Sequence, residues 1–214
     1  MRFGSETEGV EALLNGGIAD VRLDRPDKLN AMSKPMFEAL AAMIDWLGEQ
    51  DDLRCVVLSG NGRSFCVGID LASLEAGMEP LEPRTHGTAN LWQYAALGLR
   101  ALPVPVIAAI TGHAFGGGMQ IALGADVRLA APDAQLSFME MRWGLVPDMA
   151  AFVLVDGLVR DDHFRELVYT ARKVAAEEAV ALGLVTRIAA DPLAKAMELA
   201  QQIAAASPFA IGEA

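Results

Sequence analysis

The sequence predicts an α/β protein with a layered core. Short apolar runs of strand length alternate with longer stretches whose apolar residues recur at helical spacing, and no segment repeats at a fixed period. The chain has 214 residues, of which 53% are hydrophobic, so it is long enough to bury one substantial core. This length predicts one domain or two small ones.

The first fifty residues are predicted to form a strand and then a helix. Gly16-Gly17 makes a turn into residues 18–23, where apolar and polar side chains alternate as in a half-buried strand. Ser33 stands at the N-cap of the helix, and Pro35 lies in its first turn. Apolar residues then recur at helical spacing over residues 36–50, which predicts that one face of this helix packs on the sheet.

The remaining elements continue the alternation and then become mostly helical. In chain order we expect a buried strand over 55–59, a long loop over 75–89, a helix over 90–101, a buried strand over 104–110, a buried helix over 119–124 and short strands over 127–130 and 136–138. Helices are expected after that over 164–170, over 175–182 with Gly183 as C-cap, and from a cap at Asp191 to about residue 206.

The composition excludes several classes of protein. A formal charge of −11 argues against nucleic-acid partners and against an acidic membrane surface. No apolar run reaches 18 residues and no signal peptide is evident, so a soluble cytoplasmic protein is the default expectation. Cys55 and Cys66 lack CxxC or Cys/His spacing, and we therefore expect reduced thiols with neither a metal site nor a disulfide.

Two glycine-bearing corners are the most informative feature of the chain. Residues 64–71 and 112–120 each follow a short apolar run that predicts a buried strand. Two such corners side by side aim two backbone N–H groups at one oxygen, which stabilises an enolate or a tetrahedral oxyanion without a metal or a serine nucleophile. The alternative is that Gly116, Gly117 and Gly118 only permit tight packing of a helix against a strand.

Three further motifs accompany the two corners. They are Leu-Asp-Arg-Pro-Asp-Lys-Leu-Asn-Ala at 23–31, Met-Glu-Met-Arg-Trp-Gly-Leu-Val-Pro at 139–147 and Ala-Leu-Gly-Leu-Val at 181–185. In this order and spacing the chain resembles the enoyl-CoA hydratase/isomerase (crotonase) family over residues 10 to 207. The resemblance implies a crotonase-like spiral of ββα units over residues 1–190 and a helical C-terminal region, of which residues 191–214 are the truncated start.

The resemblance also implies roles for individual residues. It implies that the two backbone donors to the oxyanion are the N–H groups of Ile69 and Gly117. Glu140 matches one of the family's two catalytic glutamates, although its apolar surroundings alone are compatible with either a buried carboxylate of shifted pKa or a solvated one. The other family glutamate is Gln120 here, an amide that can hold a water molecule or orient Glu140 but cannot act as a general acid or base. This departure weakens the case for a hydratase, which uses two carboxylates around one water.

Asp148 has two explanations. If Pro147 starts a helix, Asp148 lies in the first turn, where the helix dipole stabilises a structural carboxylate. Alternatively, Asp148 matches an aspartate of the dienoyl-CoA isomerase branch, which also carries a second acid at the position of Gln120. In that branch one of the two acids, Glu140 or Asp148, removes a proton near the thioester and the other delivers it further along. Glu140 alone is also compatible with shuttling one proton between C2 and C4.

Coenzyme A is implied as part of the thioester substrate, with no tightly bound cofactor. Arg25 or Lys28 meets a phosphate in this interpretation, or both are solvated loop charges. Trp92, Phe115 and Trp143 are candidates to line the acyl pocket, but aromatic residues in apolar stretches are more often core, and they are assigned to the core by default. The residues expected to contact coenzyme A are Lys28, Ala31, Cys66, Val67, Gly68, Asp70, Leu71 and Gly116.

The expected function is double-bond isomerisation of an enoyl- or dienoyl-CoA in fatty acid metabolism. Hydration of a 2-enoyl-CoA, a lyase reaction, is the alternative enzyme, and a catalytically weak acyl-CoA binding protein is the alternative of another class. The resemblance implies a homotrimer or a hexamer built as a dimer of trimers, with the helix at 192–206 as a candidate interface. A serine hydrolase is disfavoured because no GxSxG elbow surrounds Ser64, although Ser64 and His113 lie near the two corners.

Overall fold

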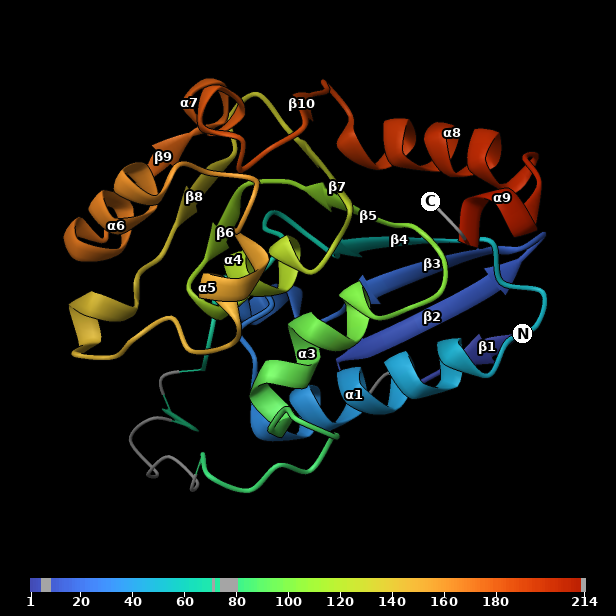
Figure 1. Ribbon diagram of the computed structural model, residues 1–214, viewed down its shortest axis with the longest axis horizontal. Helices are drawn as coiled ribbons and strands as arrows, with labels where there is room; N and C mark the ends of the chain where they lie inside the picture. The colour runs from blue at the N-terminus through green and yellow to red at the C-terminus, as the bar shows by residue number, and fades with distance from the viewer. Residues whose placement is uncertain (5–8, 71, 74–80, 213–214) are drawn as a thin grey trace.

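The chain folds around one large sheet (Figure 1). The computed structural model describes residues 1–4, 9–70, 72–73 and 81–212. The strand order is β1-β2-β3-β4-β5-β7-β10, with antiparallel pairing from β1 to β3 and parallel pairing from β3 to β10. The strands are β1 (Arg2–Phe3), β2 (Val10–Asn15), β3 (Ile18–Leu23), β4 (Cys55–Gly60), β5 (Val106–Ile110), β7 (Val127–Ala130) and β10 (Arg187–Ile188).

A second, smaller sheet continues from the end of β5. Its strands are β6 (His113–Phe115), β8 (Gln135–Ser137) and β9 (Val174–Ala175), with β6 parallel to β8 and β8 antiparallel to β9. The strand β6 had no counterpart among the predicted elements, because its three residues belong to the second glycine corner. This small sheet carries the chain from that corner to the segment that holds Glu140.

Helices cover both faces of the large sheet. In Figure 1, α1 and α3 lie together on one side of it and α8 lies on the other. The helices are α1 (Lys34–Gly48), α3 (Leu91–Arg100), α4 (Gly117–Leu123), α5 (Ala151–Leu154), α6 (Asp161–Thr170), α7 (Ala176–Leu182), α8 (Pro192–Ala204) and α9 (Pro208–Gly212), with 3-10 turns η1 (Pro26–Lys28) and η2 (Glu140–Trp143).

Strand β4 shows why both faces of the sheet are buried. Successive side chains of a strand point to opposite faces, so Val56 and Leu58 join the core around α1, whereas Cys55 and Val57 pack with Ala196 of α8. Burial of a Val or Leu side chain contributes about 1.5–3 kcal/mol. One face of α8 thus packs on the sheet of its own chain, and a subunit interface at this helix stays a prediction. A domain boundary at residue 190 stays a prediction.

Most predicted elements are confirmed in type and position. Asn90 forms the N-cap of α3, and its side chain and that of Gln93 satisfy each other's backbone N–H groups. Asp191 caps α8 by accepting a hydrogen bond from Ala194 N at 2.9 Å. Gly183 ends α7 with φ +86°, a left-handed conformation that glycine adopts without strain.

Some local expectations are wrong or lie beyond the described residues. Ser33 occupies the N-cap position of α1, but its side chain makes no capping hydrogen bond. Pro147 does not start a helix, because α5 begins only at Ala151. Residues 75–80 of the predicted loop lie outside the described residues, and residues 81–89 form neither helix nor named strand.

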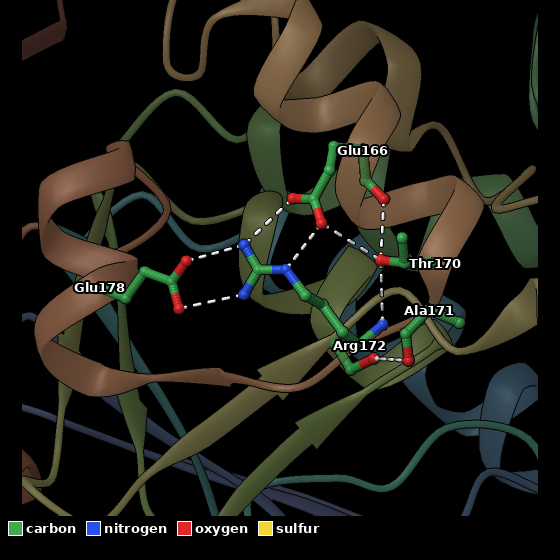
Figure 2. Close-up of polar contacts among 6 residues, drawn as sticks. Glu166, Thr170, Ala171, Arg172 and Glu178 are labelled. Atoms are coloured by element: carbon green, nitrogen blue, oxygen red, sulfur yellow. Dashed lines mark hydrogen bonds and ion pairs between the residues drawn. The ribbon is translucent and has the colours of Figure 1, made fainter.

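An ion-pair network joins α6 to α7 (Figure 2). Arg172 donates to both carboxylate oxygens of Glu166 on α6 and to both of Glu178 on α7, at distances of 2.7 to 3.0 Å. The hydrogen bonds that Arg172 donates to the two carboxylates raise the pKa of Arg172 and lower the pKa of each glutamate. One half-buried guanidinium thereby links the two helices by ion pairs.

Candidate active site

One cavity of about 720 Å³ lies where the two glycine corners meet. The corners follow the carboxyl ends of the parallel strands β4 and β5, the edge at which α/β sheets commonly place their ligands. The other walls come from α1, α3, η2 and the turn before α5. The cavity is lined by Ala31, Phe37, Val67, Gly68, Ile69, Asp70, Leu81, Trp92, Phe115, Gly116, Gly117, Gln120, Met139, Glu140, Trp143, Gly144, Leu145, Val146, Asp148 and Met149.

The two corners are in direct contact through their backbones. Gly68 has φ +93°, and a side chain there would place Cβ 2.9 Å from Phe115 O and 3.3 Å from Gly117 N. Only glycine combines this conformation with so close an approach. Hydrogen bonds from Phe115 N to Cys66 O at 3.0 Å and from Met32 N to Gly68 O at 2.8 Å hold the arrangement.

The three glycines at 116 to 118 have different structural roles. A Cβ at Gly118 would collide with the carbonyl oxygen of Cys66, so this glycine serves the tight packing that was the alternative explanation. Gly116 adopts φ +52° and ψ −123°, which a residue with a side chain rarely adopts. Gly117 is the first residue of α4 and lines the cavity. Packing therefore accounts for only part of the triplet.

The N–H groups of Ile69 and Gly117 have no hydrogen-bond acceptor among the described residues. Both residues line the cavity. The first N–H groups of a helix have no partner within it, which leaves that of Gly117 available to a ligand oxygen. Two such donors at one cavity wall have the chemistry to bind a carbonyl oxygen and to stabilise the charge that develops on it.

Glu140 is a buried carboxylate at the start of η2, with 9% of its surface exposed. Its Oε1 accepts a hydrogen bond from Gln120 Nε2 at 2.7 Å, and its buried Oε2 has no partner among the described residues. Burial raises the pKa of Glu140 and the charge of Asp148 adds to the rise, while hydrogen bonds from its own backbone and from Gln120 oppose it. Of the two possibilities for Glu140, the structure selects the buried carboxylate of shifted pKa.

Asp148 lies in the turn between η2 and α5, exposed at the cavity. Its backbone oxygen accepts a hydrogen bond from Gln93 Nε2 at 3.2 Å. Partial burial raises the pKa of its carboxyl group. Because α5 begins at Ala151 with Ala150 as N-cap, Asp148 does not lie in a first helical turn, and the explanation as a dipole-stabilised cap is wrong.

Only some of the residues expected to contact coenzyme A line the cavity. Five of them line the cavity: Ala31, Val67, Gly68, Asp70 and Gly116. Lys28 is exposed at the end of η1 and is not part of the cavity wall. Leu71 lies outside the described residues.

Arg25 and Cys66 are both committed to contacts within the chain. Arg25 donates to Ala31 O at 2.6 Å and pairs with Asp70 at 3.2 Å. The Cys66 thiol donates to Asn30 O at 3.1 Å beneath the first corner, and burial raises its pKa to about 12. Cys66 is therefore a structural thiol, and its side chain does not face the cavity.

Four aromatic side chains line the cavity, three of which the sequence analysis assigned to the core. Those three are Trp92, Phe115 and Trp143, and the fourth is Phe37 on α1. Phe37 recurs with the core residues of its helix, so periodicity alone gives no signal that it reaches a cavity. Nothing in the sequence distinguishes these aromatic residues from ordinary core.

Other sites considered from the sequence find no support. Ser64 Oγ lies 2.9 Å from His113 Nδ1, but Ser64 is fully buried and cannot reach a substrate. Within the described ranges, no three His, Cys, Asp or Glu side chains gather as a metal site would require. No helix in the same part of the chain has the length and apolar character to cross a membrane.

Comparisons of the sequence agree on one family. A sequence model described as enoyl-CoA hydratase/isomerase matches residues 14–214. Over 203 residues the chain is 36% identical to YngF of Bacillus subtilis, named as an enoyl-CoA hydratase/isomerase, covering 94% of this chain and 77% of that one. Over 208 residues it is 32% identical to the human mitochondrial Delta(3,5)-Delta(2,4)-dienoyl-CoA isomerase, covering 91% of this chain and 63% of that one.

Solved structures share the fold. A protein of Streptomyces coelicolor A3(2) that is named as an enoyl-CoA hydratase superposes with a TM-score of 0.87 at 30% identity, covering 96% of this chain and 76% of that one. A second, from Thermobifida fusca YX in complex with acetoacetyl-CoA, superposes with a TM-score of 0.84 at 34% identity, covering 96% and 84%. These neighbours confirm the predicted crotonase-like α/β fold.

Proposed function

This chain belongs to the enoyl-CoA hydratase/isomerase family, and we propose that within it the protein shifts a double bond of an enoyl- or dienoyl-CoA. Glu140 is the main acid/base and Asp148 its partner. The N–H groups of Ile69 and Gly117 form the oxyanion hole. The single observation that carries the proposal is the buried Glu140 carboxylate in the wall of the same cavity as two N–H groups that have no acceptor among the described residues.

The chemistry begins at the thioester carbonyl. Two N–H donors on its oxygen stabilise the enolate that forms when C2 loses a proton, and loss of one such donor typically lowers the rate on the order of 100-fold. A carboxylate with a raised pKa is suited both to take that proton and to return it. Coenzyme A enters as part of the substrate, held along the backbone of the corner at Val67 and Gly68.

Two routes for the proton use the same cavity. With a 3,5-dienoyl-CoA, one acid removes a proton from C2, the negative charge spreads through the diene onto the carbonyl oxygen, and the other acid protonates C6 to give the 2,4-diene. With a 3-enoyl-CoA, Glu140 alone removes a proton from C2 and returns it to C4. The placement of Asp148 on the cavity wall, outside any helical turn, supports the first route.

Hydration of a 2-enoyl-CoA is the second candidate. It is supported by the similar solved structures that are named as enoyl-CoA hydratases. Gln120 argues against hydration. A hydratase uses two carboxylates to activate one water molecule and to protonate the substrate, and Gln120 places an amide beside Glu140 where the second carboxylate would lie. An acyl-CoA binding protein of weak activity is the candidate outside enzymes, and it predicts binding without proton exchange.

Assembly and location belong to the proposal as well. We infer a cytoplasmic protein that forms a homotrimer or a dimer of trimers. Exposed apolar side chains of Phe152 and Val153 on α5 and of Tyr169 on α6 support a subunit interface at this face. Light scattering of the purified protein gives the number of subunits directly.

The test of the reaction is an ultraviolet time course with a 3,5-dienoyl-CoA. The 2,4-dienoyl product is conjugated with the thioester and absorbs differently, so turnover changes the spectrum. We expect a change that Asp148→Asn abolishes. If the Asp148→Asn variant still isomerises a 3-enoyl-CoA, the reaction uses Glu140 alone. Hydration of a 2-enoyl-CoA alone refutes the isomerase. Binding of acyl-CoA without hydrogen–deuterium exchange at C2 identifies a binding protein.

A further inference from the structure

We propose that Gln120 is a positioning residue, which holds the Glu140 carboxylate by its Oε1 in the orientation that proton transfer requires. The inference deepens the proposed function and rests on it in one respect, namely that Glu140 exchanges protons with the substrate. Gln120 is 1% exposed on α4 and lies between Glu140 and the first residue of α5.

The orientation of the Gln120 amide follows from its two partners. The backbone N–H of Ala151 can only donate, so the oxygen of the Gln120 side chain faces it, at 3.2 Å. The amide NH₂ group must then face Glu140, and its nitrogen lies 2.7 Å from Oε1. A flipped amide would place two donors against each other at Ala151 and two acceptors at Glu140. Both ends of the side chain are thereby fixed.

The two oxygens of Glu140 become chemically distinct as a result. Oε1 accepts from Gln120 and rests against the second corner, where a Cβ built on Gly116 would lie 3.5 Å from it. Oε2 is buried and has no partner in the described part of the chain. A buried carboxylate oxygen without a hydrogen bond costs free energy, so such a carboxylate in a cavity wall points to a functional role for Glu140.

Gln120 also connects the segments that carry the two acids. Its Ala151 partner lies three residues after Asp148, in the same turn and helix start. Asp148 is the titratable group whose charge acts on Glu140. Asp70, the other acid of the cavity wall, is paired with Arg25. An ionised carboxylate in place of the amide would offer Glu140 no donor and would place a second negative charge against it.

Two substitutions at position 120 test the proposal, with a third as control. Gln120→Met keeps the length of the side chain and removes both hydrogen bonds, whereas Gln120→Glu keeps the shape and the acceptor for Ala151 but removes the donor to Glu140. Gln50→Met removes an amide whose Nε2 donates to Trp46 O at 2.7 Å, away from the cavity. The control should leave activity unchanged.

We expect Gln120→Met to lower kcat on the order of 100-fold while KM stays within a few fold, since a misplaced acid/base affects the chemical step more than binding. In both variants the acid limb of the pH–rate profile should move to higher pH, because the carboxylate loses a donor that stabilised its charge. In Gln120→Glu it should move further, because a second negative charge faces Glu140. A rise in KM with kcat and the pH profile unchanged would overturn the proposal.

A second measurement needs no turnover. Glutamate labelled with carbon-13 at Cδ gives one signal that disappears in Glu140→Gln, and its titration can be followed in the substrate-free protein. A higher pKa of this signal in Gln120→Met and Gln120→Glu, with no change in Gln50→Met, supports the proposal. An unchanged pKa refutes it even where activity falls. If the wild type turns over no acyl-CoA yet the signal shifts, the proposed function fails and the positioning of Glu140 stands.

Discussion

Phe37 on α1 and Trp92 on α3 meet edge to face, with ring centroids 4.6 Å apart and ring planes at 85°. Both line the cavity, and Phe37 is fully buried whereas Trp143 on the same cavity is 57% exposed. The Phe37–Trp92 pair therefore forms an inner wall, and Trp143 lies toward solvent. Edge-to-face pairs add about 0.5–1.5 kcal/mol beyond their burial, which keeps this wall in place.

Trp92→Leu should enlarge the cavity at its inner wall. We expect kcat/KM to fall for short acyl chains, which lose contact with the ring, and to rise for longer or branched chains, which gain space. A change of one or two methylene groups in an apolar pocket is worth about 1–3 kcal/mol. Rates with acyl-CoA thioesters of increasing length measure the shift. Trp46→Leu, which alters a ring that packs on Phe3 outside the cavity, is the control and should not change the preference.

Glu140→Gln should remove nearly all turnover while acyl-CoA affinity stays within a few fold. The amide has the shape of the carboxylate but cannot take or return a proton. Steady-state rates and calorimetric binding of a CoA thioester separate the two effects. Activity retained in this variant would contradict the role of Glu140 as acid/base.

The same substitution should change how stability depends on pH. The pKa of Glu140 is raised in the folded protein, so the folded state holds its proton more tightly than the unfolded state. The stability from this group is fully present below the unfolded pKa and is lost as pH rises through the higher folded pKa. As pH rises from the unfolded pKa through the folded pKa, the Tm of the wild type should fall relative to the Tm of Glu140→Gln. A constant Tm difference between the two proteins would contradict the raised pKa.

The sequence predicted the corners and their chemistry better than the walls of the cavity. The glycines at 68 and 116 to 118 carry signals that depend on backbone conformation, and those signals are local. Phe37 and Trp92 come together only through the packing of α1 on α3, so no local pattern reports their place in the cavity. Asp148 was ambiguous for the same reason, because its place depends on where α5 begins.

Gly68→Ala should disturb both corners at once. The residue has φ +93°, and the new Cβ would lie 2.9 Å from Phe115 O, so the backbone must move or remain strained. Strain of this kind costs about 1–3 kcal/mol, and the displaced N–H of Ile69 should lower kcat by on the order of 100-fold. Gly48→Ala is the control, because a Cβ there meets nothing within 4 Å. Initial rates should fall only in the first variant, and in chemical denaturation Gly68→Ala should lose stability whereas Gly48→Ala, at the end of α1, should keep or slightly gain it.

Arg172→Gln should remove the ion pairs between α6 and α7 and slightly lower the free energy of unfolding, by an amount that depends on salt. The Arg172 side chain is 36% exposed and its two partners more so, and solvent screens such pairs, so we expect a loss of about 1 kcal/mol or less. For a chain of this length that corresponds to a Tm lower by about 2–4 °C. The difference should shrink at 1 M salt, where charges are screened within about 3 Å. Arg160→Gln removes a pair with Asp162, two residues away, and should leave Tm unchanged because it joins no separate elements. A loss for Arg172→Gln that is equal at low and high salt would assign its effect to packing of the side chain rather than to its charge.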